Sequence, residues 1–200
     1  MKLLLENWKK FINENIETAT RLSIFDFDET IAFTEGHINV TNKSTSEEFQ
    51  ISSQEEFDKL KADGGYDFDF SPLDQVNNAT ENTNITSIMR DRLRDPDTQV
   101  MVLTARDPVS IDDIHMTLQT FDEPIETQNI IMIGNKGENK GEYVRDIILS
   151  KYKNIKEIEF YDDSKKNIDE MQVIKNETSE NGRIEKFDIY IVEKGIPNLT

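Results

Sequence analysis

The stretch Ser23-Ile24-Phe25-Asp26-Phe27-Asp28-Glu29-Thr30 runs from apolar residues into two carboxylates that stand one residue apart. The apolar part predicts a strand, and the polar part predicts its end. Because side chains alternate along a strand, Asp26 and Asp28 share one side if the extended geometry continues. Neighbouring carboxylates repel each other unless a cation or a shared proton relieves the repulsion. The stretch therefore indicates either a polar strand end with a solvated turn or a functional site.

Similar apolar runs recur along the chain, and helical patterns separate several of them. The runs are short, β-branched or aromatic, and nearly continuous, which is typical of buried parallel strands. The predicted strands are Leu22–Phe27, Gln99–Thr104, Asn129–Ile133, Ile155–Tyr161 and Phe187–Val192. Apolar residues at helical spacing predict helices at Ile111–Phe121, Glu142–Tyr152 and Ser164–Ile174. This alternation predicts an α/β fold with three layers around a parallel sheet.

The polar, acidic region between the first two strands interrupts the pattern. Because it is too long for a structureless loop in a compact domain, we expect residues 36–96 to form an inserted lid. Short helices are predicted near Ser53–Lys61 and Ser87–Arg94, and a partly disordered insertion is the alternative. The other expected boundaries are a core at residues 21–35 and 97–194, a polar loop at 176–186, and a tail at 195–200.

An amphipathic pattern precedes the first strand. Its apolar residues recur at helical spacing and are Leu4, Leu5, Trp8, Phe11, Ile12 and Ile16. They predict an N-terminal helix within residues 1–20. Because an exposed apolar stripe is unusual, this helix either packs on the main domain or docks a partner or a second copy of the chain.

Composition restricts the functions that the chain can have. Its 200 residues carry a formal net charge of −17, which disfavours nonspecific binding to nucleic acid or to anionic membranes. A small phosphate held by a metal and a few local cations remains compatible with that charge. The chain has no cysteine, which excludes disulfides and thiolate chemistry and fits a cytoplasmic location. The N-terminal apolar run is too short for a signal peptide, and no segment is long enough to span a bilayer.

Polar groups follow several of the predicted strands or precede a helix. Because sites in α/β sheets form beyond the carboxyl ends of the strands, we expect these groups to gather at one edge. They are Asp26 and Asp28 after the first strand, Thr104 and Arg106 after the second, Lys136 and Lys140 before a helix, and Asp162 and Asp163 after the fourth strand.

These residue types suit phosphoryl transfer. Carboxylates are preferred ligands of Mg²⁺, which also binds substrate phosphate. One aspartate can attack phosphorus and form an aspartyl-phosphate, while a neighbouring carboxyl protonates the leaving oxygen and then activates water. A hydroxyl and a lysine can neutralise the phosphoryl oxygens in the transition state.

Four segments, in their order along the chain, resemble the four motifs of the haloacid-dehalogenase-like (HAD) superfamily. They are Asp26-Phe27-Asp28-Glu29-Thr30, Leu103-Thr104-Ala105-Arg106, a lysine before a helix, and Tyr161-Asp162-Asp163-Ser164. The resemblance covers residues 22–175 and implies a Rossmann-like sheet with an inserted cap at the position called C1. The segment Phe68-Asp69-Phe70-Ser71 also resembles HAD-like phosphatases of tailed phages.

The resemblance implies a role for each matched residue. Asp26 is the nucleophile and Asp28 the general acid/base, whose backbone carbonyl usually also contacts the metal. Thr104 hydrogen-bonds a phosphoryl oxygen, and Lys140 neutralises the nucleophile and the phosphate. The implied metal ligands are Asp26, Asp28, Asp162 and Asp163, and the residues expected to hold the first loop or bind substrate are Thr30 and Arg106.

Three assignments stay open at this point. Lys136 is the alternative to Lys140, which we prefer because it stands directly at the start of a predicted helix. Arg106 either binds a substrate phosphate or forms a structural ion pair. Asn167 either braces the acidic loop or lies on the helix surface.

We therefore expect a Mg²⁺-dependent phosphomonoester hydrolase that acts on a small phosphate such as a nucleotide, in the cytoplasm of a host if the chain is viral. The first alternative is a nucleic-acid end-processing phosphatase, which requires a basic face from Arg90, Arg92, Arg94 and Arg106. These arginines otherwise pair with neighbouring aspartates on a solvated helix. The second alternative is a binding module recruited through the N-terminal helix. A receiver-like phospho-switch fits less well, because its acidic pair and its phosphoacceptor aspartate come in a different order.

Overall fold

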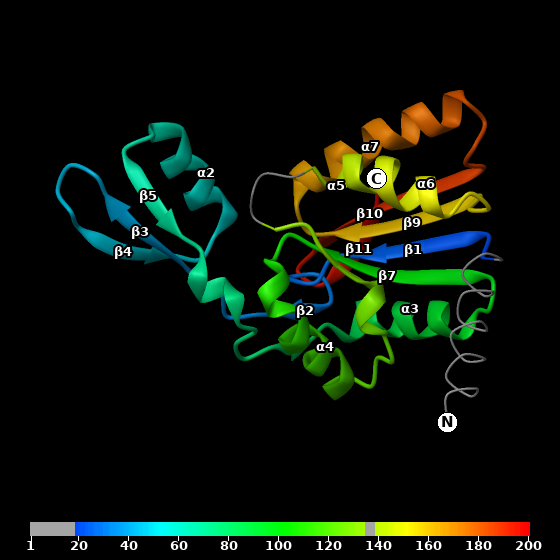
Figure 1. The fold of residues 1–200 in the computed structure, drawn as a ribbon, viewed down its shortest axis with the longest axis horizontal. Helices are drawn as coiled ribbons and strands as arrows, with labels where there is room; N and C mark the ends of the chain where they lie inside the picture. Colours follow the sequence, from blue (N-terminus) through cyan, green and yellow to red (C-terminus); the bar gives the residue numbers. More distant parts are fainter. Residues whose placement is uncertain (1–18, 135–138) are drawn as a thin grey trace, which may run out of the picture.

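The computed structural model describes residues 19–134 and 139–200 (Figure 1). Its centre is a six-stranded sheet in the order β11-β10-β9-β1-β7-β8. Neighbouring strands from β10 to β8 are parallel, and β11 is antiparallel to β10. The strands are β1 (Arg21–Phe25), β7 (Thr98–Thr104), β8 (Ile130–Met132), β9 (Glu157–Asp162), β10 (Lys186–Glu193) and β11 (Ile196–Leu199).

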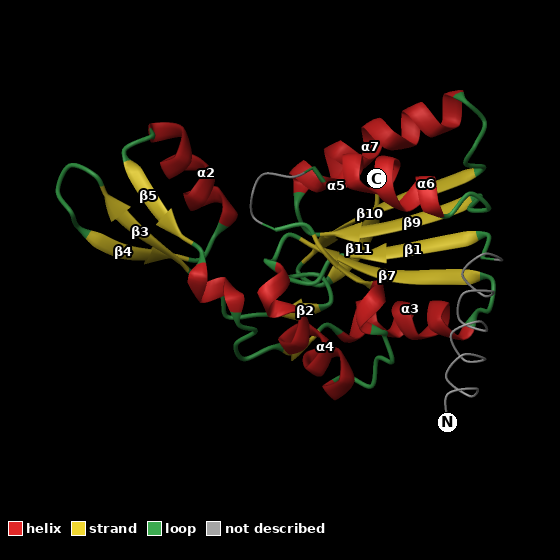
Figure 2. Ribbon diagram, viewed as in Figure 1, coloured by secondary structure: helices red, strands yellow, loops and turns green. Residues whose placement is uncertain are grey.

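Helices cover both faces of this sheet, which produces the three layers that the sequence predicts (Figure 2). One face carries α5 (Lys140–Tyr143), a π-helical turn (Val144–Ile148), α6 (Leu149–Lys151) and α7 (Lys165–Glu180). The other face carries α3 (Thr83–Arg94) and α4 (Ile111–Thr120), with short 3-10 turns at Pro108–Ser110 and Thr127–Asn129 on either side of α4.

The side chains of β1 belong to both faces of the core. Leu22 and Ile24 lie in the apolar cluster under α5 and α7, whereas Phe25 lies in the cluster under α3 and α4. Because both faces are buried, the strand is mostly apolar, and its buried Ser23 donates its hydroxyl to Glu159 at 3.0 Å. The ring of Phe25 stacks on Tyr161 with centroids 4.7 Å apart, and Tyr161 stacks on Tyr190 at 4.5 Å, across three neighbouring strands. These contacts hold the strands that end at the acidic residues.

Residues 38–69 form a second unit, which we call the small lobe. Its antiparallel sheet has the order β4-β3-β5 and consists of β3 (Ile38–Asn42), β4 (Glu48–Ile51) and β5 (Tyr66–Asp69). The helix α2 (Gln54–Asp63) begins at the N-cap Ser53, and its Phe57 ring packs edge-on against Phe68 and Phe70. Figure 1 shows the small lobe beyond the edge of the main sheet to which β1 and β9 point.

Two connections join the small lobe to the core. On the way out, β2 (Ala32–Phe33) pairs antiparallel with β6 (Thr80–Glu81), which closes the base of the insertion. On the way back, the chain passes through the 3-10 turn η1 (Ser71–Asp74). We call residues 71–79 the return segment.

Within residues 19–134 and 139–200, the predicted strands and helices are confirmed, but the insertion is shorter than residues 36–96. Its expected second helix begins earlier, as α3, and packs on β7 of the core instead of belonging to the lid. Ile85 and Met89 are fully buried against the sheet. An apolar stripe at this spacing is buried most effectively on a large flat surface, which the small lobe does not offer.

Two further boundaries differ from the prediction. Residues 195–200 were expected to be a tail, but Ile196–Leu199 form β11 and pair with β10. The loop expected at 176–186 is partly helical, because α7 continues to Glu180 and buries Thr178. The Thr178 hydroxyl donates to the carbonyl of Ile174 at 2.8 Å, so the buried hydroxyl has a hydrogen-bond partner within its own helix.

Two predictions concern residues that the structure does not describe. The first is the N-terminal helix within residues 1–20, of which 1–18 lie outside the described residues. The second is Lys136, which also lies outside them. Among the described helices, none is long and apolar enough to cross a membrane.

Candidate functional site

The carboxyl ends of β1, β7 and β9 meet at one edge of the main sheet. The strand register pairs Phe25 with Val102 on one side and with Tyr161 on the other. The backbone N–H of Asp26 continues this ladder by donating to the carbonyl of Tyr161 at 2.9 Å. The residues that follow the three strands are therefore neighbours, as the sequence predicts.

Lys140 is the centre of the candidate site. Its ammonium lies 2.6 Å from Asp26 Oδ1 and 2.8 Å from Asp162 Oδ2. All three side chains are buried, with exposed fractions of 2%, 8% and 0% for Lys140, Asp26 and Asp162. A buried ammonium costs several kcal/mol unless opposite charges compensate it, so these contacts form a single electrostatic unit.

The start of α5 sets the position of this lysine. Asn139 caps the helix, because its side-chain oxygen accepts from the backbone N–H of Glu142 at 2.9 Å. The backbone N–H of Lys140 donates to Glu170 Oε2 of α7 at 3.0 Å. Lys140 is thereby fixed to two helices before its side chain reaches the acidic residues.

A group of three carboxylates surrounds the ammonium. One oxygen each of Asp26, Asp162 and Asp163 lies within 4.8 Å of the others. If all are ionised, three negative charges face one positive charge, which leaves two negative charges in a small volume. A divalent cation would neutralise this excess. Oxygen donors of this kind fit Mg²⁺ better than a soft metal, so the donor set agrees with the expected ion.

Asp162 is oriented by the first turn of the following helix. Its Oδ1 accepts from the backbone N–H of Ser164 and from Asn167 Nδ2, both at 2.9 Å. Asn167 also reaches Asp162 Oδ2 at 3.1 Å. Of the two interpretations of Asn167, the structure therefore favours the brace of the acidic loop.

The surroundings change the proton affinities of the cluster. Burial raises the pKa of Asp26 well above its usual range, and the charges of Asp162 and Asp163 add to this, while Lys140 opposes it. Partial loss of solvation and the neighbouring charge of Asp162 raise the pKa of Asp163 to about 7. Burial alone would lower the pKa of Lys140, but the carboxylates of Asp162 and Asp26 raise it above its usual value. Lys140 therefore stays charged near neutral pH.

The carboxylate of Asp28 lies outside this group, although the resemblance includes Asp28 among the metal ligands. It forms a two-fold ion pair with Arg106, whose Nε and Nη2 each lie 2.8 Å from one carboxylate oxygen. Thr34 Oγ1 donates to Asp28 Oδ1 at 2.6 Å. The ion pair with Arg106 therefore separates the carboxylate of Asp28 from the three carboxylates that could hold a metal.

The sequence allows two roles for Arg106, which are binding of a substrate phosphate and a structural ion pair. Its side chain is 4% exposed, and its guanidinium is directed to Asp28 and to backbone carbonyls of the return segment. The structure therefore places Arg106 in an internal ion pair and not at the surface that a substrate would approach.

The two threonines of the motifs are both buried. Thr104 Oγ1 accepts from the backbone N–H of Arg106 at 3.2 Å, so its hydroxyl proton is free to donate elsewhere. The hydroxyl of Thr30 has no hydrogen-bond partner among the described residues, and its carbonyl accepts from Asn82 Nδ2 at 2.8 Å. With 0% exposure, Thr30 holds the loop after β1 but does not present its side chain to a substrate.

Sequence reasoning missed three residues that build this site. They are Thr34 on Asp28, Asn82 on the loop carbonyl of Thr30, and Glu170 on the N–H of Lys140. Asn82 lies 52 positions and Glu170 lies 30 positions from its partner. A polar side chain at such a separation carries no local pattern, so only the folded arrangement identifies it.

The arginines of α3 all have acidic partners. Arg90 contacts Glu81 at 2.5 Å and Glu123 at 2.8 Å, and Arg92 forms a two-fold pair with Glu159. Arg94 pairs with Asp91, one of its expected partners. These side chains therefore do not form a basic face.

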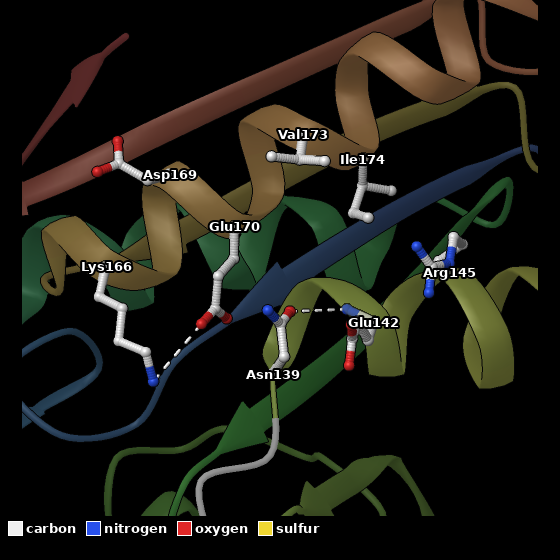
Figure 3. Close-up of a pocket in the computed structure, with 8 residues that line it drawn as sticks. All are labelled: Asn139, Glu142, Arg145, Lys166, Asp169, Glu170, Val173 and Ile174. Atoms are coloured by element: carbon white, nitrogen blue, oxygen red, sulfur yellow. Dashed lines mark hydrogen bonds and ion pairs between the residues drawn. The ribbon is translucent and has the colours of Figure 1, made fainter.

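A groove of 610 Å³ lies on the outer side of α5 and α7 (Figure 3). Figure 3 shows that its lining combines the apolar side chains of Val173 and Ile174 with polar side chains, of which Lys166 pairs with Glu170 and Asn139 accepts from the N–H of Glu142. None of the three clustered carboxylates lines this groove. The clustered carboxylates and this groove are therefore separate features.

Comparison of the chain with protein-family models, with curated proteins and with solved structures gives no match. The function is consequently inferred from the geometry of the site and from the motifs in the sequence.

Proposed function

We propose that the protein is a Mg²⁺-dependent phosphomonoester hydrolase of the HAD-like type. The observation that carries this proposal is the buried ammonium of Lys140 between Asp26 and Asp162, with Asp163 beside them, at the carboxyl edge of a parallel sheet. This edge is where α/β proteins bind ligands, and its carboxylate oxygens suit a hard divalent cation.

In the proposed reaction, a carboxylate oxygen of Asp26 attacks the phosphorus atom and displaces the oxygen of the leaving alcohol. Asp28, in its protonated form, donates a proton to that oxygen and later, as a carboxylate, takes one from the water that hydrolyses the aspartyl-phosphate. Phosphate is released and the carboxylate of Asp26 is restored. The water enters without any redox change, so atoms and charges balance.

Lys140 and Thr104 support the same reaction. The ammonium of Lys140 favours the ionised form of Asp26, against the effect of burial, and neutralises charge on the phosphoryl oxygens. The free hydroxyl proton of Thr104 is available for one of these oxygens. Mg²⁺, held by Asp26, Asp162 and Asp163 together with the backbone carbonyl of Asp28, would supply Lewis-acid stabilisation of the phosphate.

The small lobe supports a small substrate in this proposal. It is inserted after β1 and stands beyond the edge where the acidic residues gather, which is the place of a C1-type cap (Figure 1). We propose a small phosphate such as a nucleotide, hydrolysed in the cytoplasm. The end-processing alternative requires a basic face that binds a nucleic-acid strand. Because Arg90 and Arg92 pair with glutamates of the same chain, this alternative has less support than a small substrate.

The test is release of inorganic phosphate from mononucleotides, sugar phosphates and phosphorylated oligonucleotides, with Mg²⁺ and with EDTA. We expect metal-dependent release from mononucleotides and no release by Asp26→Asn, because an amide is a poor nucleophile of similar shape. Far-UV circular dichroism of the variant checks that the fold is intact. Release from oligonucleotides alone would move the proposal to end processing, and near-full activity of Asp26→Asn would show that another residue is the nucleophile.

A further inference from the structure

Arg106 joins two parts of the molecule that are far apart in sequence. One end of its guanidinium binds Asp28, 78 positions away, through two bonds of 2.8 Å. The other end donates from Nη1 to the carbonyls of Leu73 at 2.6 Å and Gln75 at 2.9 Å, both in the return segment. A guanidinium has five N–H donors, and these contacts use four of them.

The contact with Asp28 fixes the orientation of the carboxylate. Arg106 binds one oxygen through Nε and the other through Nη2, and Thr34 donates to the oxygen that Nη2 contacts. A planar fork on a planar carboxylate permits essentially one arrangement, which a lysine cannot reproduce.

The contact with the return segment ties the same guanidinium to the small lobe. Leu73 belongs to η1, which directly follows the small lobe, and Gln75 is the next residue after that turn. Ser110 Oγ adds a third donor to this region, at 3.4 Å from the carbonyl of Leu73. Because the side chain of Arg106 is almost fully buried, displacement of the return segment would leave two of its N–H groups without partners.

We propose that Arg106 is a positioning residue that couples the return segment of the small lobe to the acid/base carboxylate of Asp28. This inference rests on the proposed function, since it gives the contact a catalytic meaning. Arg106 does not touch the substrate: it holds Asp28 in one orientation while the carbonyls of Leu73 and Gln75 are in place. A displacement of the small lobe thus changes the orientation of the residue that protonates the leaving group.

The first test separates positioning of an acid from general damage to the site. Arg106→Lys keeps the charge but loses the fork. We compare hydrolysis of p-nitrophenyl phosphate, whose leaving group needs little protonation, with that of β-glycerophosphate, whose alkoxide leaving group needs a proton. We expect kcat/KM, which covers the steps up to release of the leaving group and not the later hydrolysis of the aspartyl-phosphate, to fall about 10- to 100-fold for β-glycerophosphate and less than about 5-fold for p-nitrophenyl phosphate.

Arg92→Lys is the matched control for this comparison. It breaks another two-fold arginine–carboxylate pair, with Glu159, which does not involve Asp28. We expect it to leave the ratio of the two rates unchanged. If Arg106→Lys lowered kcat/KM equally for β-glycerophosphate and p-nitrophenyl phosphate, or for neither, the positioning role would be overturned.

The second test measures the coupling without any turnover. Amide hydrogen exchange at residues 73–78 reports the stability of the return segment. Because coupling is reciprocal, removal of the carboxylate in Asp28→Ala should weaken the hold of Arg106 on Leu73 and Gln75 and speed exchange there about 3- to 30-fold. Asp26→Asn removes a carboxylate that does not contact Arg106 and should leave exchange at these amides unchanged.

The two tests also separate the coupling from the proposed function. Unchanged exchange in both Asp28→Ala and Arg106→Lys, with β1 protected as in the wild type, would overturn the coupling. If the wild type releases no phosphate from any ester, the proposed function fails. Amide exchange in the return segment then tests the coupling between this segment and Asp28 without any activity. Faster exchange in Asp28→Ala would support the coupling, and unchanged exchange would overturn it.

Discussion

At the scale of single residues, the buried charges are unevenly compensated. Lys140 has two carboxylates within hydrogen-bond distance, so its own charge is well matched. Glu123 is the opposite case, because its side chain has 0% exposure and, among the described residues, its one ion-pair partner is Arg90, which also pairs with Glu81. Arg90 Nε is 2.8 Å from Glu123 Oε1, but neither oxygen of Glu123 accepts a well-aligned hydrogen bond from the described residues.

This imbalance makes Glu123 a source of pH-dependent stability. Burial raises the pKa of Glu123 from 4.5 to about 7, opposed by Arg90 and assisted by Glu81. The folded state therefore binds this proton more tightly than the unfolded chain, and the free energy of unfolding falls as pH rises through this range. Glu123→Gln removes the titration, and we expect it to raise the free energy of unfolding at about pH 8 by roughly 1–3 kcal/mol, with little gain at about pH 4.5.

Urea denaturation over this pH range measures the effect. Asp122→Asn is the control, because Asp122 is adjacent but exposed, and the variant should keep most of the wild-type pH dependence. If Glu123→Gln changed stability by the same amount at both ends of the range, packing and not ionisation would be the cause.

At the scale of elements, α5 and α7 approach each other closely enough to constrain the residue after Lys140. A methyl group on Gly141 would lie 2.9 Å from the carbonyl oxygen of Glu170 and 3.1 Å from its carbon, which are backbone atoms that cannot rotate away. We expect Gly141→Ala to lower the free energy of unfolding by roughly 1–3 kcal/mol, because α5 must move away from α7. Urea denaturation gives this difference.

The same displacement should also affect the site. Lys140 shares the first turn of α5, and its N–H binds Glu170 of α7, so movement of α5 draws the ammonium away from Asp26. Gly65→Ala is the matched control, because its added methyl meets only the end of the Asp63 side chain, at 3.3 Å. Wild-type stability of Gly141→Ala would show that the two helices separate without cost.

At the scale of the whole molecule, we expect the acidic cluster to make stability depend on a divalent cation. Mg²⁺ that binds the folded state but not the unfolded chain stabilises by mass action. At ten times its dissociation constant, the gain is about 1.4 kcal/mol, which we expect to see as a higher Tm in millimolar Mg²⁺ than in EDTA. Differential scanning calorimetry measures this shift without a substrate.

Two variants identify where the cation binds. Asp163→Asn removes one of the three clustered carboxylates and should reduce the shift in Tm. Asp91→Asn removes an exposed charge of α3 outside the cluster and should leave it unchanged. A Tm that is the same in Mg²⁺ and in EDTA would count against a shared metal site.

The sequence alone determined the framework of this protein. Nearly continuous apolar runs mark the buried strands, because a strand covered on both faces is apolar at most of its positions. The polar residues directly after those runs locate the candidate site, since parallel strands end at a common edge. Asp26, Asp162 and Lys140 could therefore be predicted as neighbours although 114 positions separate Asp26 from Lys140.

The partner of each polar side chain, in contrast, follows from how the folded elements pack. The pairing of Asp28 with Arg106, the hold of Arg106 on Leu73 and Gln75, and the burial of Glu123 depend on distances across packed elements. The true end of the insertion was decided in the same way, because a helix pattern does not tell which surface the helix covers. An apolar pattern is local and readable in sequence, whereas a polar contact is specific to two atoms and exists only once the chain has brought them together.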